Sequence, residues 1–101
     1  MTKADIVEHI ATKTGLTKTD TSLVLEGIIE TLKDALVAGQ TVEIRGFGTF
    51  RIRPRAARRA RNPRTGDPVD IPPRFVPTFK PSRELKEAVD ERNQPGHPAI
   101  L

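Results

Sequence analysis

One segment of this chain carries more positive charge than a packed core can hold. From Ile44 to Gly66 it contains eight arginines and no acidic residue, although the whole chain nets only +4. The segment contributes +8, so the rest of the chain nets −4. Charged side chains are almost never fully buried without a partner, so we expect this segment to lie outside the core. Arginine at this density is suited to holding the phosphates of a polyanion in fixed geometry.

The remaining sequence is short of core-forming residues. The chain has 101 residues, four Phe, no Trp, no Tyr and no Cys. A core this small usually needs a disulfide, a metal or oligomerisation. The cysteine count excludes disulfides and thiolate metal sites, and His9 and His97 are too few and too far apart to suggest a structural metal. We therefore predict one domain that oligomerises, without a metal or cofactor.

No apolar run approaches the length of a membrane span, and no signal peptide is visible. The first residues lead directly into a helical pattern. We expect a soluble, intracellular protein that has no membrane partner.

The N-terminal part of the chain predicts two helices joined by a tight turn. Thr2 and Asp5 have the spacing of a capping box, and Gly15 is a natural helix stop. A second start at Thr17 precedes a broad apolar stripe that ends at Gly39. Gly27 lies inside this stripe, where it costs roughly 1 kcal/mol relative to Ala, and we expect it to mark a close helix approach.

After Thr41 the apolar period changes from helical to alternating. Two short strands are predicted around Gly46-Phe47-Gly48, a third near Val76 and Phe79, and a last short helix capped by Ser82. The fold class is therefore α+β. The prolines at 68, 72, 73 and 77 are too many for a central strand, so the segment between the strands is predicted to be a projecting two-stranded ribbon. If residues 51–61 are extended, Arg51, Arg53, Arg55, Arg59 and Arg61 share one face and Arg58 lies on the other.

Three motifs in this order resemble the HU/IHF family of bacterial nucleoid proteins. They are Gly46-Phe47-Gly48-Thr49-Phe50, Arg61-Asn62-Pro63-Arg64-Thr65-Gly66 and Pro77-Thr78-Phe79-Lys80-Pro81. The resemblance implies a DNA-binding domain over residues 1–91 with an arm at about 53–75, followed by a flexible tail at 92–101. It also implies that the two helices form an intertwined dimer body, beside a three-stranded antiparallel sheet and a short C-terminal helix.

The resemblance further implies a function for the arm. Two arms would follow the minor groove of double-stranded DNA, Pro63 would wedge between base pairs, and the bend would compact the nucleoid with low sequence specificity. The partner chain would be a second copy, or a paralogue in a heterodimer, and the location would be the cytoplasmic nucleoid. The DNA-binding residues implied are Arg45, Arg53, Arg55, Arg58, Arg59, Arg61, Asn62, Pro63, Arg64, Lys3, Lys80, Arg83 and Lys86.

Two residues have ordinary alternative interpretations. Arg45 is more simply explained by pairing with Glu43 on the same strand, but Glu43-Ile44-Arg45 also resembles the site-preferring IHF branch. In that alternative, Arg45 adds sequence preference by reading DNA shape in the minor groove. Pro63, taken alone, is a turn former, and only the family resemblance favours a wedge.

Other functional classes fit the sequence less well. No nucleophile–base constellation and no phosphate-binding Gly-rich loop is present, so an enzyme acting on a small-molecule substrate is not expected. A ribosomal type of RNA-binding protein is the next class, weakened by the lack of Tyr and Trp for base stacking. A pure protein-interaction module leaves the arginine segment unexplained.

Overall fold

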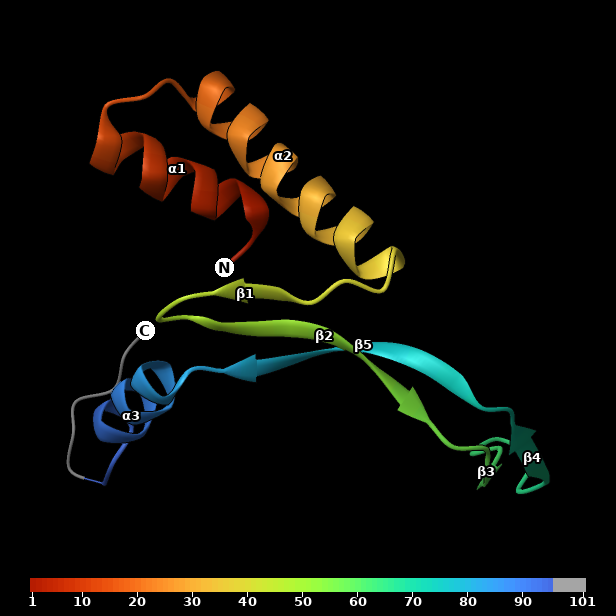
Figure 1. Cartoon of the computed structure of the whole chain (residues 1–101). Helices are drawn as coiled ribbons and strands as arrows, with labels where there is room; N and C mark the ends of the chain where they lie inside the picture. Colours follow the sequence, from red (N-terminus) through yellow and green to blue (C-terminus); the bar gives the residue numbers. More distant parts are fainter. Residues whose placement is uncertain (96–101) are drawn as a thin grey trace.

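The computed structural model of this chain describes residues 1–95, and it contains three helices and five strands (Figure 1). The helical predictions and the α+β class are confirmed. In chain order the elements are α1 (Lys3–Thr14), α2 (Lys18–Val37), β1 (Val42–Ile44), β2 (Gly48–Arg55), β3 (Arg58–Arg61), β4 (Pro68–Ile71), β5 (Arg74–Pro81) and α3 (Arg83–Arg92).

The helical hairpin is set by its caps. The Thr2 hydroxyl accepts from the Asp5 backbone N–H, and the Asp5 carboxylate accepts from the Thr2 N–H, which completes the predicted capping box. Gly15 ends α1 with φ +78°, a left-handed conformation that suits glycine. The Thr17 hydroxyl caps α2 by accepting from the Asp20 N–H. The two helices therefore begin after the threonines predicted to cap them, Thr2 and Thr17.

The predicted three-stranded sheet is also present, in the antiparallel order β1-β2-β5. A turn joins β1 to β2, and in it the Phe47 N–H donates to the Ile44 carbonyl at 3.0 Å and Gly46 has φ +82°. β5 is an edge strand, which explains how it tolerates Pro77 and Pro81.

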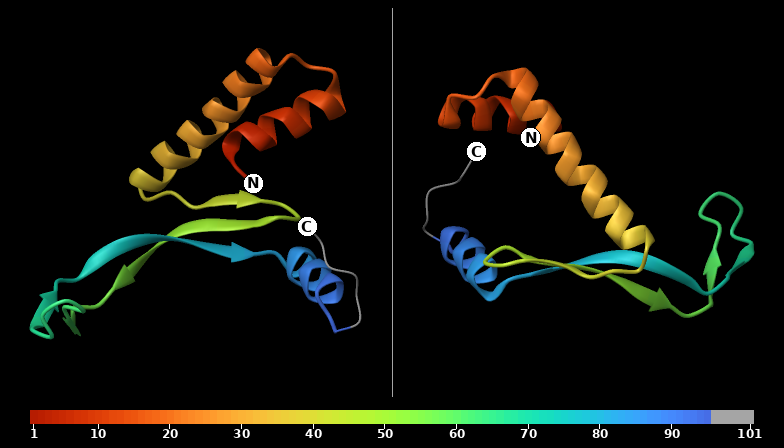
Figure 2. Two further views of the ribbon diagram at one scale, coloured as in Figure 1. Left: turned by 180° about the vertical axis from the view of Figure 1, so that it is seen from behind. Right: turned by 45° about the horizontal axis from the view of Figure 1, so that its top comes forward.

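The arm continues the β2–β5 ribbon but is not one unbroken ladder. Pairing of β2 with β5 ends at Arg55 opposite Arg74, and a separate two-stranded sheet, β3–β4, follows (Figure 2). Residues 56–57 and 72–73 lie outside the strands. The premise that residues 51–61 are continuously extended is therefore wrong, and the single arginine face it predicted does not carry across the break.

Helices α1 and α2 lie on one side of the three-stranded sheet, and only the C-terminal end of α2 approaches it (Figure 1). Three phenylalanines pack together on the sheet, with ring centroids 4.8 Å apart for Phe50 and Phe79 and 5.1 Å apart for Phe47 and Phe79. Across residues 1–95, only Ala11, Thr21 and Gly48 are buried. The radius of gyration is 18.9 Å, compared with about 13 Å for a compact chain of this length. The predicted shortage of core is therefore confirmed.

Gly27 does not approach another helix within the chain. A Cβ built on it meets no atom within 4 Å. The expected close approach is thus absent from the isolated chain, because the face of α2 that carries Gly27 has no neighbour there.

At the other end of the chain, α3 is longer than expected. Ser82 caps it as predicted, but the helix includes Arg92, the residue at which the tail was predicted to start. Residues 96–101 of that predicted tail lie outside the described part of the chain. Within the described part, no helix has both the length and the apolar character needed to cross a membrane.

Candidate nucleic-acid interface

The face of the sheet opposite the helices is rich in cations. Ile52 and Phe75 line a hollow of about 610 Å³ with Leu36 and Val37 of α2, so their side of the sheet faces the helices. Side chains alternate along a strand, so the neighbouring positions face away. Arg51 and Arg53 of β2 and Lys80 of β5 occupy that outer side.

A second hollow, of about 490 Å³, lies at the end of this outer face. Its lining joins β1, the following turn, β2, the end of β5 and the start of α3, and it contains five cationic side chains and one carboxylate, Glu43. The cations are Arg45, Arg51, Lys80, Arg83 and Lys86. Four of these five were predicted from the sequence to contact DNA, and the fold brings them together from positions up to 41 residues apart.

Arg51 belongs to this cluster although it was not predicted as a DNA-binding residue. Its Nε atom is buried and has no hydrogen-bond partner among the residues that the structure describes. Unsatisfied buried donors are uncommon and call for an explanation. The sequence does contain an indication of this position. Arg51 and Arg53 are two residues apart on an extended strand, so both side chains are expected on one face of it.

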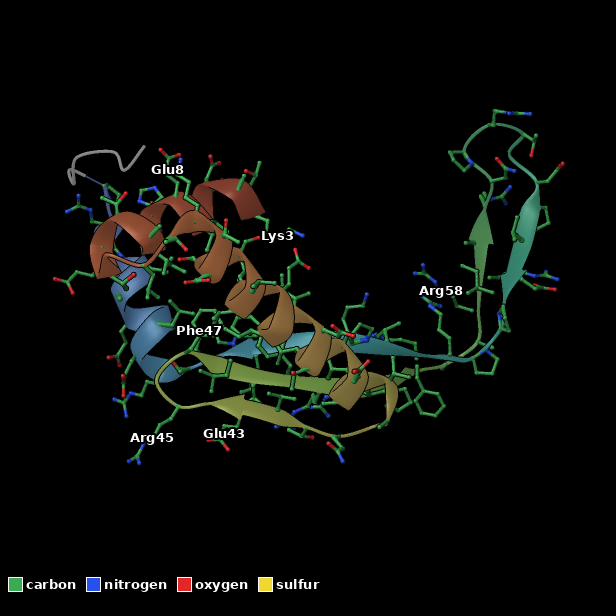
Figure 3. The ribbon with its side chains drawn as sticks, turned by 90° about the horizontal axis from the view of Figure 1, so that it is seen from above. Lys3, Glu8, Glu43, Arg45, Phe47 and Arg58 are labelled. Atoms are coloured by element: carbon green, nitrogen blue, oxygen red, sulfur yellow. The ribbon has the colours of Figure 1, made fainter. Side chains whose placement is uncertain are left out.

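The expected Glu43–Arg45 pair does not form. Both residues are exposed, and within residues 1–95 no ion pair links them. Figure 3 shows both side chains directed away from the body of the protein. The simple pairing interpretation of Arg45 is therefore wrong for this chain, and its guanidinium is available for another partner.

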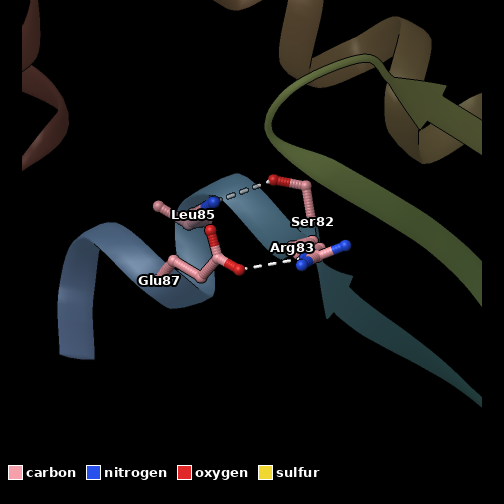
Figure 4. Close-up of polar contacts among 4 residues, drawn as sticks. All are labelled: Ser82, Arg83, Leu85 and Glu87. Atoms are coloured by element: carbon pink, nitrogen blue, oxygen red, sulfur yellow. Dashed lines mark hydrogen bonds and ion pairs between the residues drawn. The ribbon is translucent and has the colours of Figure 1, made fainter. Parts of the chain in front are cut away.

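The N-terminus of α3 is fastened to the β1–β2 turn. The Ser82 backbone N–H donates to the Phe47 carbonyl at 2.8 Å, and the Ser82 hydroxyl donates to the Gly46 carbonyl at 2.9 Å. The same hydroxyl accepts from the Leu85 N–H at 3.1 Å (Figure 4). Arg83 is held by Glu87 one turn along, with Nε 2.9 Å from Oε1. The positive end of α3 is thus fixed beside the cationic hollow.

Lys3 lies apart from this cluster. It projects from the start of α1 and pairs with Glu26 of α2, and it does not line the hollow (Figure 3). The isolated chain therefore does not unite Lys3 with the other predicted residues.

The root of the arm holds several arginines without carboxylate partners. Within the described residues, Arg53, Arg55 and Arg58 make no ion pair. Arg55 lies directly opposite Arg74 in the β2–β5 register. Like charges directly opposite each other destabilise a sheet pair, so this position favours an anionic ligand between them. Arg74 was missed because the sequence does not reveal the register.

The tip of the arm is a compact turn. The Asn62 N–H donates to the Asp67 carbonyl at 2.9 Å, and the Gly66 N–H donates to the Asn62 carbonyl at 2.7 Å. The Asn62 side-chain oxygen accepts from the Arg64 N–H at 2.9 Å, and Gly66 has φ +76°. These bonds leave Pro63 exposed at the end of the arm.

Two further arginines of the arm are engaged within it. Arg59 Nε donates to Asp70 Oδ1 at 3.0 Å, and Arg61 Nη1 donates to the Gly66 carbonyl at 3.0 Å. The sequence predicted both residues as DNA contacts but not these internal partners.

This combination of a cationic sheet face and a cationic projecting arm defines a nucleic-acid-binding class of protein. The family described as "Bacterial DNA-binding protein" matches residues 1–90. This chain belongs to that family, whose named members include HU and IHF subunits and which consists of architectural DNA-binding proteins rather than enzymes.

Individual relatives fall on both branches. The chain is 50% identical to integration host factor subunit beta of Marinobacter nauticus over 97 residues, covering 95% of this chain and 99% of that protein. It is 47% identical to DNA-binding protein HU of Thermotoga maritima over 89 residues, covering 88% of this chain and 99% of that one. Among solved structures, an Anabaena HU–DNA cocrystal structure matches with a TM-score of 0.82 and 37% identity, covering 88% of this chain and 97% of that chain.

Proposed function

We propose that this protein is a dimeric architectural factor that binds the minor groove of double-stranded DNA and bends it, with low sequence specificity. The observation that carries the proposal is the cationic surface that runs from the hollow beside α3, along the outer sheet face, to the arm. Such a surface favours binding to phosphates irrespective of sequence. The proposed location is the nucleoid in the cytoplasm.

Dimerisation is supported by the apolar side chains that the isolated chain leaves exposed. Leu23, Val24 and Ile28 of α2 are 68%, 59% and 50% exposed, and Val37 and Phe75 are 88% and 74% exposed. Burying such a surface is the main favourable term in protein association. A second copy of this chain, or a paralogue with the same face, would cover it and would supply a second arm.

Bending is proposed to start at the arm tips. Pro63 is exposed on a turn that is held by hydrogen bonds, so it can enter the groove without losing internal contacts. Unstacking a base step costs a few kcal/mol, and the bend brings more phosphates to the protein. The sheet face and the start of α3 would then contact the flanking DNA backbone. The proposed contacts are Arg45, Arg53, Arg55, Arg58, Arg59, Arg61, Asn62, Arg64, Lys3, Lys80, Arg83 and Lys86.

A second candidate is an IHF-like factor that prefers particular sites. The observation that favours it is the exposed guanidinium of Arg45 at the end of the sheet, which makes no ion pair with any residue of the described range 1–95. Competition between random DNA and DNA with an A-tract tests it, with Arg45→Ala as the comparison. Affinity ratios near unity for the unaltered protein would exclude this candidate.

The test of the main proposal is a comparison of linear, nicked and four-way-junction DNA. Because nicked and junction DNA bend at lower cost, we expect tighter binding to both than to linear duplex. Log K should fall by about 0.9 for each phosphate contact per unit of log salt concentration. Equal affinity for the three DNAs, or a flat salt profile, would contradict the proposal, and a preference for structured RNA would favour the ribosomal alternative.

A further inference from the structure

The arm contains a single ion pair within its described residues, and it joins the two strands of the β3–β4 ribbon. Arg59 and Asp70 lie directly opposite each other in the register, with Nε 3.0 Å from Oδ1. The side chains are 74% and 81% exposed. Neither is buried by the ribbon, so both remain within reach of a ligand that lies along the arm.

The two faces of the ribbon differ in chemistry. Arg59, Asp70 and Arg61 share one face, because Arg59 pairs with Asp70 and Arg61 with Pro68. Ala60, Val69 and Ile71 share the other face with Arg58. The carboxylate therefore lies on the same face as two of the arginines that the proposed function assigns to DNA.

The pair has little value as a structural link. Exposed ion pairs typically contribute between nothing and about 1 kcal/mol to stability. The pair matters more for the binding of a polyanion, because a phosphate that approaches the Arg59 guanidinium also approaches the Asp70 carboxylate. The negative charges of the phosphate and of the Asp70 carboxylate repel each other. Arg59 with its carboxylate partner therefore attracts a phosphate less strongly than Arg58 does.

We propose that Asp70 competes with DNA phosphate for the Arg59 guanidinium, so that Arg59 contacts DNA only at the cost of its pair with Asp70, which limits the affinity of the arm. This inference rests on the proposed function and deepens it, since it names a residue that tunes the same interface. The Arg59–Asp70 pair of the free arm has to open before Arg59 contacts a phosphate, and the loss of the pair offsets part of the binding free energy of that contact.

The arm offers a matched control for the test. Asp67 is the other carboxylate between residues 53 and 75, and in the described structure it makes no ion pair. Asp67→Asn and Asp70→Asn change the net charge equally, but only the second releases an arginine. Binding to the same linear duplex is measured over a range of salt concentrations for the unaltered protein and for both variants.

We expect Asp70→Asn to tighten binding by about two- to five-fold per arm, the range that an exposed ion pair spans. It should also steepen the salt slope by about 0.9 per arm, whereas Asp67→Asn leaves the slope unchanged. Arg59→Ala should weaken binding more in the Asp70→Asn background than in the unaltered protein. Thermal unfolding checks that the body is intact in each variant.

Two outcomes separate this inference from the function on which it rests. If the unaltered protein binds duplex DNA with a clear salt slope but Asp70→Asn behaves like Asp67→Asn, or binds more weakly, the inference alone is overturned. If the unaltered protein shows no salt-dependent duplex binding, the proposed function is overturned and the inference with it.

Discussion

The two antiparallel ribbons of this chain use the same backbone pairing but are stabilised differently. The β2–β5 ribbon has eight residue pairs and is backed by the packed rings of Phe47, Phe50 and Phe79. The β3–β4 ribbon has four pairs and one exposed ion pair. A two-stranded ribbon is marginally stable alone. The comparison indicates that apolar packing stabilises the body, whereas the arm has half as many residue pairs and an exposed ion pair in place of packed rings.

Removing an aromatic ring from the body is expected to have the largest effect. Phe79→Ala deletes the ring that contacts both other phenylalanines, and it should lower the free energy of unfolding by about 2–4 kcal/mol. Val69→Ala on the arm is the comparison, with an expected change below about 1 kcal/mol. Urea unfolding measures both. Equal losses would mean that arm and body share one core and that the two ribbons are stabilised in the same way.

Pro63→Ala is expected to change bending rather than stability. Loss of the wedge removes the unstacking of base pairs at the arm tip, so the bend angle measured by FRET between DNA ends should fall, while urea unfolding stays nearly unchanged. Pro68→Ala, at the first residue of β4 and outside the tip turn, is the control. A bend angle that is the same for Pro63→Ala and the unaltered protein would refute the wedge.

Gly27→Ala tests whether the exposed face of α2 is covered in the proposed dimer. In an isolated helix, alanine is more stable than glycine by about 1 kcal/mol, and the isolated chain has open space at this position. If a partner chain packs against Gly27, the added methyl group should instead destabilise the dimer, by about 1 kcal/mol or more. Concentration-dependent unfolding gives the sign. A more stable protein would place the dimer contact elsewhere.

The smallest expected effect concerns the first helix cap. The hydrogen bonds from the Thr2 backbone N–H and side chain hold the pKa of the Asp5 carboxyl below its ordinary value of 3.8, with a minor contribution from His9. A lowered pKa stabilises the folded state above the unfolded pKa, and this contribution is lost as pH falls through the folded value. Asp5→Asn should therefore be less stable than the unaltered protein at neutral pH. The difference should start to shrink as pH falls to the unfolded pKa of about 3.9, and it should be lost once pH has fallen through the lowered folded pKa. A difference that persists at pH 2 would assign the effect to the side-chain shape instead.

Local signals predicted most of the elements correctly. The caps at Thr2, Thr17 and Ser82 act within one helical turn, so residue type alone located the three helix starts. The alternating pattern and the Gly46–Gly48 turn located the sheet for the same reason. The prediction failed at the break at residues 56–57 and missed Arg51 and Arg74, whose neighbours come from a distant strand. The Glu43–Arg45 pair failed for a local reason, because Arg45 lies in the turn after β1 and not on the strand.

The cationic arm, the capped helical hairpin and the shortage of core all follow from composition or from contacts within a few residues, so they can be predicted from the amino-acid sequence. Which charged side chains lie together depends on the packing of distant segments. The strand register placed Arg59 against Asp70 and Arg55 against Arg74, and the docking of α3 on the β1–β2 turn gathered Arg45, Arg83 and Lys86 into one hollow. Register and docking depend on pairing between residues far apart in the chain, which no local pattern encodes.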